Sequence, residues 1–236
     1  STLFPYTTLF RSTFVHQEQL RAEFCLNWLK AQGADCAYMD DALNVILPIG
    51  SADEDLVVFM AHSDVVFPDT TPLPLRIEDG KLFCPGVGDD TANVVALLMA
   101  AKYIIQHQLT PENTGVLLVV NSCEEGLGNL KGCRKIMDTF GTRVREFVTF
   151  DAGVFTVIND AVGSRRYNIE IKTEGGHSYS AFGNRNAIAC MAELIHDLYS
   201  VPVPPIGKAT YNVGTISGGT SVNTIAQQAQ MLYEFR

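Results

Sequence analysis

Apolar positions recur along the chain with two spacings that alternate with one another. Short β-branched or apolar runs bounded by Gly, Pro, Ser or Asp are typical of buried strands, and apolar residues at helical spacing indicate helices. The predicted strands are 44–49, 56–61, 115–120 and 146–150. The predicted helices are 16–32, 91–108 and 130–140. Because strands and helices alternate, we expect an α/β fold with a mostly parallel sheet and helices on both faces.

The first predicted helix has an apolar face. Leu20, Phe24 and Trp28 follow helical spacing, and Cys25 and Leu29 join them. We therefore expect an amphipathic surface helix that packs through these side chains.

The pattern changes after residue 151, where a half-exposed alternating strand is predicted over 165–172. A helix over 187–199 and strands over 211–216 and 229–235 follow. This order predicts a small α+β layer with an antiparallel sheet. We therefore expect two domains, 13–159 and 160–236.

Residues 1–12 stand apart from both predicted domains. The run TLFPYTTLFRS lacks the basic start, the continuous apolar stretch and the cleavage site of a signal peptide. It matches what one reading frame of a widely used short-read sequencing adapter would encode, so we interpret 1–12 as an assembly artefact. The alternative is an ordinary disordered N-terminus. On the first interpretation the chain is a fragment of a gene, and its end at Arg236 is equally arbitrary.

Composition narrows the function classes. With 26 acidic and 17 basic residues the net charge is −9, and no basic stripe offers a nucleic-acid surface. The longest apolar run, 94–101, is far shorter than the roughly 20 residues that span a bilayer, so we expect no membrane segment. The six cysteines form no C-x-x-C pair, which favours reduced thiols and a cytoplasmic protein.

Residues of the metal-ligand type follow three of the predicted strands. Carboxyl ends of neighbouring parallel strands meet at one edge of a sheet, where ligands collect. A glycine-containing loop ahead of the 91–108 helix adds further carboxylates. These residues are His62-Ser63-Asp64, Glu124-Glu125 and Asp151 after the strands, and Asp89-Asp90 in the loop.

Crowded carboxylates repel one another, and a divalent cation neutralises them. One imidazole with several carboxylates fits zinc, manganese or cobalt better than calcium. If its strand continues, Asp64 can accept the N–H of the His62 imidazole; the alternative is a His–Asp pair that satisfies a core histidine. Strand alternation would place Glu124 and Glu125 on opposite sides, so that one binds metal while the other acts as a base. Their alternative is a solvated acidic loop.

Six phrases of the sequence, taken together, resemble the co-catalytic metallopeptidase family that includes aminoacylase, peptidase T, glutamate carboxypeptidase and the acetylornithine and succinyl-diaminopimelate deacylases. They are MAHSDVVFP, CPGVGDDTAN, NSCEEGLGNLKG, TFDAG, TEGGHSYSAFGNRNAI and GGTSVNTIAQQAQMLYEFR. In the family's order they cover nearly everything from residue 15 to residue 236. The resemblance implies a metal-binding catalytic domain and a small dimerisation or lid domain, both incomplete here.

The resemblance also implies a metal site with two divalent ions, zinc above all. In it, His62 and Asp151 bind one ion, Asp89 bridges both and Glu125 binds the second. Asp64 matches the partner of the metal-binding histidine. The family's last ligand, a histidine from a C-terminal stretch, is absent from this chain, and we expect none of the other helical histidines to replace it. The chain as given is therefore expected to bind metal weakly or singly and to have little activity.

Roles near the substrate follow from the same resemblance. Glu124 matches the general base, and His177 matches a histidine that reaches the substrate carbonyl, often in the partner subunit's site. Asn223 and Arg236 match substrate-contacting positions. Their alternatives are a surface-loop histidine, a turn-forming amide and a frayed terminus. One further departure is Thr91-Ala92, where many relatives carry an acidic residue or Met and then Lys-Gly.

For the complete protein we expect hydrolysis of an amide bond in a small peptide, as in a di- or tripeptidase or a peptidase T-like aminopeptidase. A metal-bridging water and Glu124 as the base would carry the reaction. The alternative substrate class is N-acyl amino acids. The non-enzymatic alternative is an inactive homologue that serves as a dimerisation module, although the intact ligand set argues against it. We expect a homodimer through the lid domain.

Overall fold

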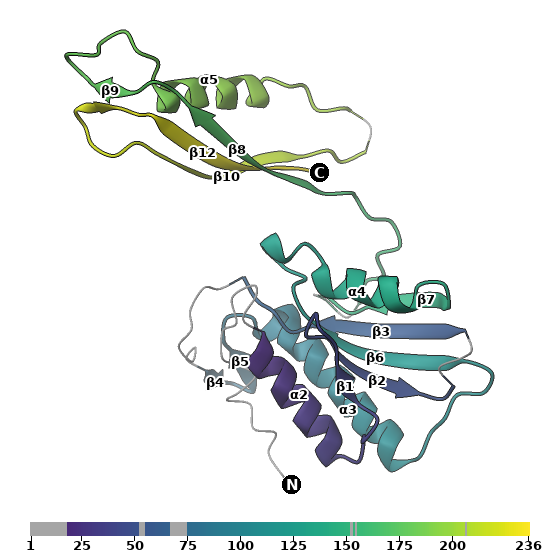
Figure 1. Ribbon diagram of the computed structural model, residues 1–236. Helices are drawn as coiled ribbons and strands as arrows, with labels where there is room; N and C mark the ends of the chain where they lie inside the picture. The colour runs from purple at the N-terminus through teal and green to yellow at the C-terminus, as the bar shows by residue number, and fades with distance from the viewer. Residues whose placement is uncertain (1–17, 52–54, 67–74, 152, 154, 206) are drawn as a thin grey trace. The chain divides into compact units, whose positions relative to one another are not determined.

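The computed structural model describes residues 18–51, 55–66, 75–151, 153, 155–205 and 207–236 (Figure 1). The chain divides into two compact units, residues 1–155 and 156–236. This division lies four residues before the predicted boundary at 159. The proposed artefact at 1–12 lies outside the described residues.

Unit 1 contains a five-stranded sheet in the order β1-β2-β6-β3-β7. The strands are β1 (Tyr38–Met39), β2 (Val45–Ile49), β3 (Leu56–His62), β6 (Gly115–Asn121) and β7 (Val144–Thr149). β3 runs parallel to both β6 and β7, whereas β2 pairs antiparallel with β6 and β1. The α/β class is confirmed, and the sheet is mixed. The reason lies in the six residues between β2 and β3, which are too few for the crossover that parallel strands need.

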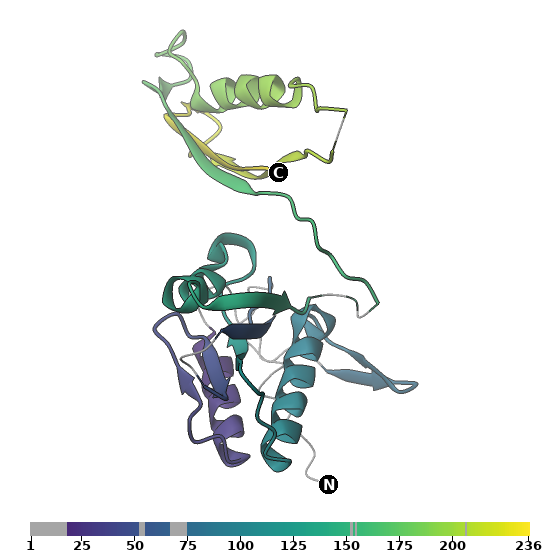
Figure 2. The same cartoon turned by 90° about the vertical axis from the view of Figure 1, so that its right-hand side faces the viewer.

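Both faces of this sheet are covered by helices. Alternate residues of the strands, such as Leu118 and Val120 of β6, pack under α2 (Gln19–Ala31) and α3 (Ala92–Gln106). The intervening residues, Leu117 and Val119, pack under α4 (Lys131–Phe140) through the fully buried Ile136. Figure 2 shows α4 on the opposite side of the sheet from α2 and α3. The continuous apolar strands follow from this double coverage.

The buried face of α2 differs from the predicted one. Its buried residues are Arg21, Ala22, Cys25 and Leu29, whereas Leu20 is 53% exposed. Phe24 and Trp28 lie at the border, partly buried against the core. The predicted buried face was therefore centred too close to Leu20. The apolar pattern gave no reason to place a charged residue at the centre of the buried face.

The connection between β3 and α3 carries a hairpin and an irregular turn. β4 (Arg76–Glu78) and β5 (Lys81–Phe83) pair antiparallel. The turn η1 (Val87–Thr91) then leads directly into α3. A second short turn, η2 (Gly126–Gly128), lies between β6 and α4.

Unit 2 is an antiparallel sheet with one helix. Its strand order is β10-β12-β8, and a separate short pair joins β9 to β11. Met231 of β12 is fully buried beneath α5, and Ile169 and Ile171 of β8 are partly buried against it. The elements are β8 (Arg165–Lys172), β9 (Gly176–His177), α5 (Ala187–Tyr199), β10 (Tyr211–Gly218), β11 (Thr224–Ile225) and β12 (Gln228–Phe235). This is the predicted α+β arrangement.

Within the ranges given above, no helix has the length and apolar character needed to cross a bilayer. All six cysteines lie in those ranges, and each is a free thiol.

Candidate metal centre

Three neighbouring parallel strands end at one edge of the unit 1 sheet. His62 is the last residue of β3, Glu124 and Glu125 follow β6, and Asp151 follows β7. Since β3 lies between β6 and β7 and runs parallel to both, these residues start from adjacent strand ends. The fold therefore brings one imidazole and several carboxylates to this edge of the sheet, as the sequence predicts.

The turn η1 brings two further carboxylates against His62. The Nε2 atom of His62 lies 3.1 Å from Oδ1 of Asp89, and the backbone N–H of His62 donates to Oδ2 of Asp90 at 2.9 Å. Gly86 opens this turn with a φ of +72°, and a Cβ there would lie 2.5 Å from Cγ1 of Val65. Only glycine fits both the dihedral angle and the space.

The ligand atoms form two groups that share His62. In one group they come from His62, Glu124 and Glu125, and in the other from His62, Asp90 and Asp151. Within each group the atoms all lie within 4.8 Å of one another. Asp89 is in neither group, although it contacts His62 directly, and its side chain is 60% exposed. The cluster can therefore surround more than one position with oxygen and nitrogen donors.

Asp64 lies beneath the cluster and is fully buried. Its two carboxylate oxygens accept the backbone N–H groups of Glu124 at 3.0 Å and of Glu125 at 2.8 Å. The closest acceptor for Nδ1 of His62 is the Asp64 backbone carbonyl at 3.1 Å, with the carboxylate at 3.7 Å. The expectation that this carboxylate takes the imidazole proton required β3 to continue, but β3 ends at His62. With the proton on Nδ1, Nε2 is the atom that can bind a metal ion.

The predicted opposition of Glu124 and Glu125 is wrong. Ligand atoms of both glutamates lie within 4.8 Å of each other and of His62. The alternation argument fails because β6 ends at Asn121 and Cys123 has a φ of +54°, so the pleat of the strand does not extend to the glutamates.

The electrostatics of the cluster call for positive charge. Burial by itself lowers the pKa of His62, but the carboxylates of Asp64, Asp90 and Glu124 outweigh it and raise the pKa to about 10. Burial raises the pKa of Asp90 to about 7, and burial followed by repulsion from nearby carboxylates raises the pKa of Glu124. Burial and repulsion from Asp89 raise the pKa of Glu125. A site that draws protons this strongly onto its donors fits a divalent cation.

Unit 2 holds the other three predicted residues, and it brings only two of them together. His177 pairs with Thr224 in the β9–β11 ladder, and the N–H of Ser178 donates to the carbonyl of Asn223 at 2.9 Å. Arg236 follows the far end of β12, eight strand residues beyond this pair, or roughly 25 Å at the usual rise per residue. Its Nε donates to Glu234 at 2.7 Å.

The sequence argument missed three residues that contact the cluster or the loops carrying it. Asp90 was noticed only as the neighbour of Asp89, yet it is buried and accepts from both His62 and Asn93. Glu18 and Arg21, at the start of α2, are also buried. Arg21 lies four residues before Cys25 on the buried face, but the apolar pattern gives no signal for a charged residue there.

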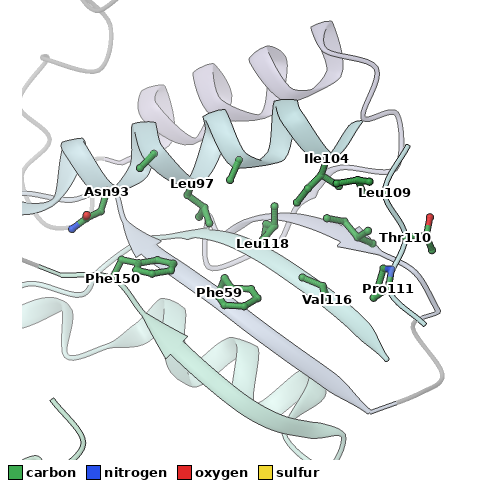
Figure 3. Close-up of a pocket in the computed structure, with 13 residues that line it drawn as sticks. Phe59, Asn93, Leu97, Ile104, Leu109, Thr110, Pro111, Val116, Leu118 and Phe150 are labelled. Atoms are coloured by element: carbon green, nitrogen blue, oxygen red, sulfur yellow. The ribbon is translucent and has the colours of Figure 1, made fainter. Parts of the chain in front are cut away.

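The cavity of about 670 Å³ between α3 and the sheet is separate from these carboxylates (Figure 3). Apolar side chains line it, including Phe59, Leu97, Ile104 and Phe150. Its connection to the cluster is Asn93, which lies at one end and donates to Asp90. The ligand residues of the cluster are not among those that line this cavity.

An α/β unit with an imidazole and carboxylates at the carboxyl ends of parallel strands defines a class of protein with a metal-type centre. Residues 58–234 match the profile described as Peptidase family M20/M25/M40, and the chain belongs to this family. M20 is a family of metal-dependent hydrolases.

Two curated relatives are deacetylases. The chain is 25% identical over 220 residues to an acetylornithine deacetylase from Myxococcus xanthus, covering 84% of this chain and 56% of that protein. It is 26% identical over 196 residues to an N-acetyldiaminopimelate deacetylase from Bacillus pumilus, covering 77% of this chain and 50% of that protein. The chain thus spans about half the length of these relatives.

Solved structures share the fold. An M20 metallo-carboxypeptidase from Sulfolobus solfataricus matches with a TM-score of 0.69 at 14% identity, over 97% of this chain and 69% of that one. A Bacillus subtilis protein described as a dinuclear metal-binding peptidase of the M20 family matches with a TM-score of 0.56 at 17% identity, over 97% of this chain and 61% of that one.

Proposed function

We propose that the protein containing this chain is a metal-dependent hydrolase that cleaves an amide bond in small peptides. The observation that carries the proposal is the convergence of His62 with Glu124 and Glu125, and with Asp90 and Asp151, at one edge of the sheet. Membership of family M20 supports the same reaction class.

The proposed centre holds two divalent ions, preferably zinc, because imidazole with carboxylates is a zinc-type donor set. His62 and Asp151 would hold one ion and Glu125 the other, and Asp89 would be a ligand shared by both. Asp89 is preferred to Asp90 because both oxygens of Asp90 already accept hydrogen bonds, from His62 and Asn93. Such ions, when bound, polarise a carbonyl and lower the pKa of water.

Glu124 is the proposed general base. Burial is the main cause that raises the pKa of Glu124, so this pKa lies closer to neutral pH than that of an exposed glutamate. The hydrogen bond from its backbone N–H to Asp64 fixes where its side chain starts. Glu124 would take a proton from the attacking water and deliver it to the leaving amine.

His177 is the proposed donor to the substrate carbonyl. Its Nδ1 accepts the backbone N–H of Tyr179 at 3.3 Å, which leaves the proton on Nε2, free to donate to an oxyanion. Asn223 lies beside it, and Arg236 is the proposed carboxylate contact. Because His177 and Arg236 lie at opposite ends of unit 2, one copy of unit 2 cannot bring both to one small substrate. This separation favours a homodimer that shares its sites.

N-acyl amino acids are the second candidate substrate class. The observation that favours them is that both curated relatives described above are deacetylases. Deacylation uses the same base and the same ligands, so only the groups that recognise the substrate would differ. An inactive homologue acting as a dimerisation module is the non-enzymatic alternative.

The proposal is tested by separating metal content from turnover. Elemental analysis of the protein that contains this chain, after dialysis against zinc, should find at least one tightly held ion per subunit. In the protein that contains this chain, Glu124→Gln should lower turnover of di- and tripeptides and of N-acyl amino acids by about 10²–10⁴-fold, because the base is lost. Its zinc content should stay close to that of the unsubstituted protein.

The matched control is Glu112→Gln, an exposed carboxylate outside the cluster, which should change neither quantity. Substantial activity in Glu124→Gln would remove Glu124 from the role of base. Absence of bound zinc, manganese and cobalt in the unsubstituted protein would contradict the metal-dependent function itself.

A further inference from the structure

Arg21 is a buried charge in the first turn of α2. Its residue exposure is 2%, and its Nη1 donates to the backbone carbonyl of Ser63 at 2.5 Å. Ser63 lies between His62 and Asp64 and is held from another side by Asn121, whose carbonyl accepts from both the N–H and the hydroxyl of Ser63. The guanidinium therefore completes the clamp on the turn that follows β3.

Packing alone does not explain a charge at this position. α2 is already anchored by apolar contacts of Ala22, Cys25 and Leu29 with the core, so Arg21 is not needed to attach the helix. Removing a guanidinium from water is costly, and an apolar side chain of similar volume often serves packing equally well. Burial lowers the pKa of the Arg21 guanidinium to about 10, and its hydrogen bond to the Ser63 carbonyl is a contact that an apolar side chain could not make.

Asp64 transmits the effect to the cluster. Its carboxylate oxygens accept the N–H groups of both Glu124 and Glu125, and its backbone carbonyl accepts from His62. A shift of Asp64 would therefore displace three donors together. The same turn of α2 also reaches the segment before the glutamates, where Oε1 of Glu18 accepts the Cys123 thiol at 3.4 Å.

We propose that Arg21 is a positioning residue for the metal centre: it holds the Ser63 carbonyl and so fixes the turn 62–64, which sets the geometry of His62, Glu124 and Glu125. This rests on the proposed function, because positioning matters only if the cluster binds metal. The effect of Arg21 on these three side chains is transmitted through residues 63 and 64.

Two readouts test this on the whole chain. The first is amide hydrogen exchange of Glu124 and Glu125 in the metal-free protein, expressed relative to Val119 in the core of β6. The second is zinc affinity. Arg21→Met and Arg21→Gln remove the charge, Arg21→Lys keeps it, and Leu29→Ala is a control that weakens the same helix without touching the cluster.

We expect Arg21→Met and Arg21→Gln to raise the relative exchange of the two amides about tenfold and to weaken zinc binding about 10–100-fold. Arg21→Lys should retain more protection and affinity than Arg21→Gln. Leu29→Ala should speed exchange throughout unit 1 in proportion, so the ratio to Val119 stays constant.

The proposal is overturned if a folded Arg21→Met or Arg21→Gln protein has the same exchange ratio and the same zinc affinity as the unsubstituted chain. It is also overturned if Arg21→Lys retains no more protection and affinity than Arg21→Gln. If Arg21→Met does not fold, the comparison of Arg21→Gln with Arg21→Lys in the same two readouts decides whether the proposal holds. If the protein that contains this chain binds no zinc, the proposed function fails, while the exchange ratio in this chain still decides whether Arg21 holds the glutamate backbone.

Discussion

Asp64 shows how one buried carboxylate can organise a site without belonging to the candidate ligand groups. Burial raises its pKa, but hydrogen bonding by His62 and by the N–H groups of Glu125 and Glu124 outweighs burial and lowers the pKa overall. It therefore stays charged and acts as an acceptor only. Its buried side chain orients two consecutive glutamates, and its backbone carbonyl accepts from His62.

Replacing this acceptor by an amide tests that role. Asp64→Asn keeps the shape but can accept only one of the two N–H groups, which leaves the other buried donor facing an NH2 group. We expect a loss of about 1–3 kcal/mol in the free energy of unfolding. We also expect zinc affinity to fall about 10–100-fold. Urea unfolding and zinc titration measure the two effects.

The control is Asp41→Asn, whose exposed carboxylate pairs with Lys135 on the surface. It should change stability by less than about 0.5 kcal/mol and leave zinc affinity unchanged. Equal zinc affinity in Asp64→Asn and the unsubstituted chain would show that the glutamates do not depend on Asp64.

At the scale of single residues, the sequence predicts which residues belong to the candidate site better than it predicts how their side chains are oriented. His62, Asp89, Glu124, Glu125 and Asp151 could be named because their residue types follow strands or a glycine turn. The hydrogen bonds of Asp64 could not, since they depend on where β3 and β6 stop, and a shift of one residue in a strand end reverses which side a carboxylate faces.

At the scale of elements, the start of α4 supports the glutamate loop. The N–H of Gly132 donates to the carbonyl of Ser122, two residues before Glu124. A Cβ on Gly132 would collide with that carbonyl oxygen and would lie 2.5 Å from Oδ1 of Asn44. Because these neighbours are backbone or buried, the helix approaches this loop only with glycine at position 132.

Gly132→Ala should therefore move the loop rather than the helix alone. We expect a loss of about 1–3 kcal/mol in the free energy of unfolding, as for overpacked sites. Zinc affinity should fall because the segment carrying Glu124 and Glu125 is displaced. Gly163→Ala is the control, since a Cβ there meets no atom within 4 Å. A stable Gly132→Ala protein with full zinc affinity would refute the packing argument.

Helices and strands were predicted correctly where the hydrophobic pattern extended over many residues. The strand over 165–172 and the helix over 187–199 have the predicted bounds, and β6 differs by one residue. The short pairs β4–β5 and β9–β11 were missed because two or three residues carry no periodicity. The buried face of α2 was misplaced because Arg21 is held there by its hydrogen bond to Ser63, which an apolar pattern cannot reveal.

At the scale of the whole molecule, the metal-type donors all lie in unit 1, and so does the single tryptophan, Trp28 of α2. Its fluorescence therefore reports on the unit that should bind the ion. Zinc at 100 times its dissociation constant should raise the free energy of unfolding by about 2.7 kcal/mol, and a chelator should remove the gain. His62→Ala should abolish the effect, whereas His107→Ala, beyond α3, should retain it.

The last prediction concerns the sharing of a site between two copies. If His177 serves the partner's centre, a dimer of one Glu124→Gln copy and one His177→Ala copy contains one site with both substitutions and one site with neither. Each variant alone should be nearly inactive in the protein that contains this chain. Random reassociation of equal amounts makes half the dimers mixed, so about a quarter of the sites, and of the activity, should return.

The recovery requires exchange of subunits, so mixing after brief partial denaturation should restore activity and mixing without it should restore less. Two Glu124→Gln preparations treated in the same way serve as the control and should stay inactive. If His177 instead acted within its own subunit, every site in a mixed dimer would carry one substitution. Mixed samples would then show only the sum of the two residual activities, which would exclude the shared site while leaving the metal centre in place.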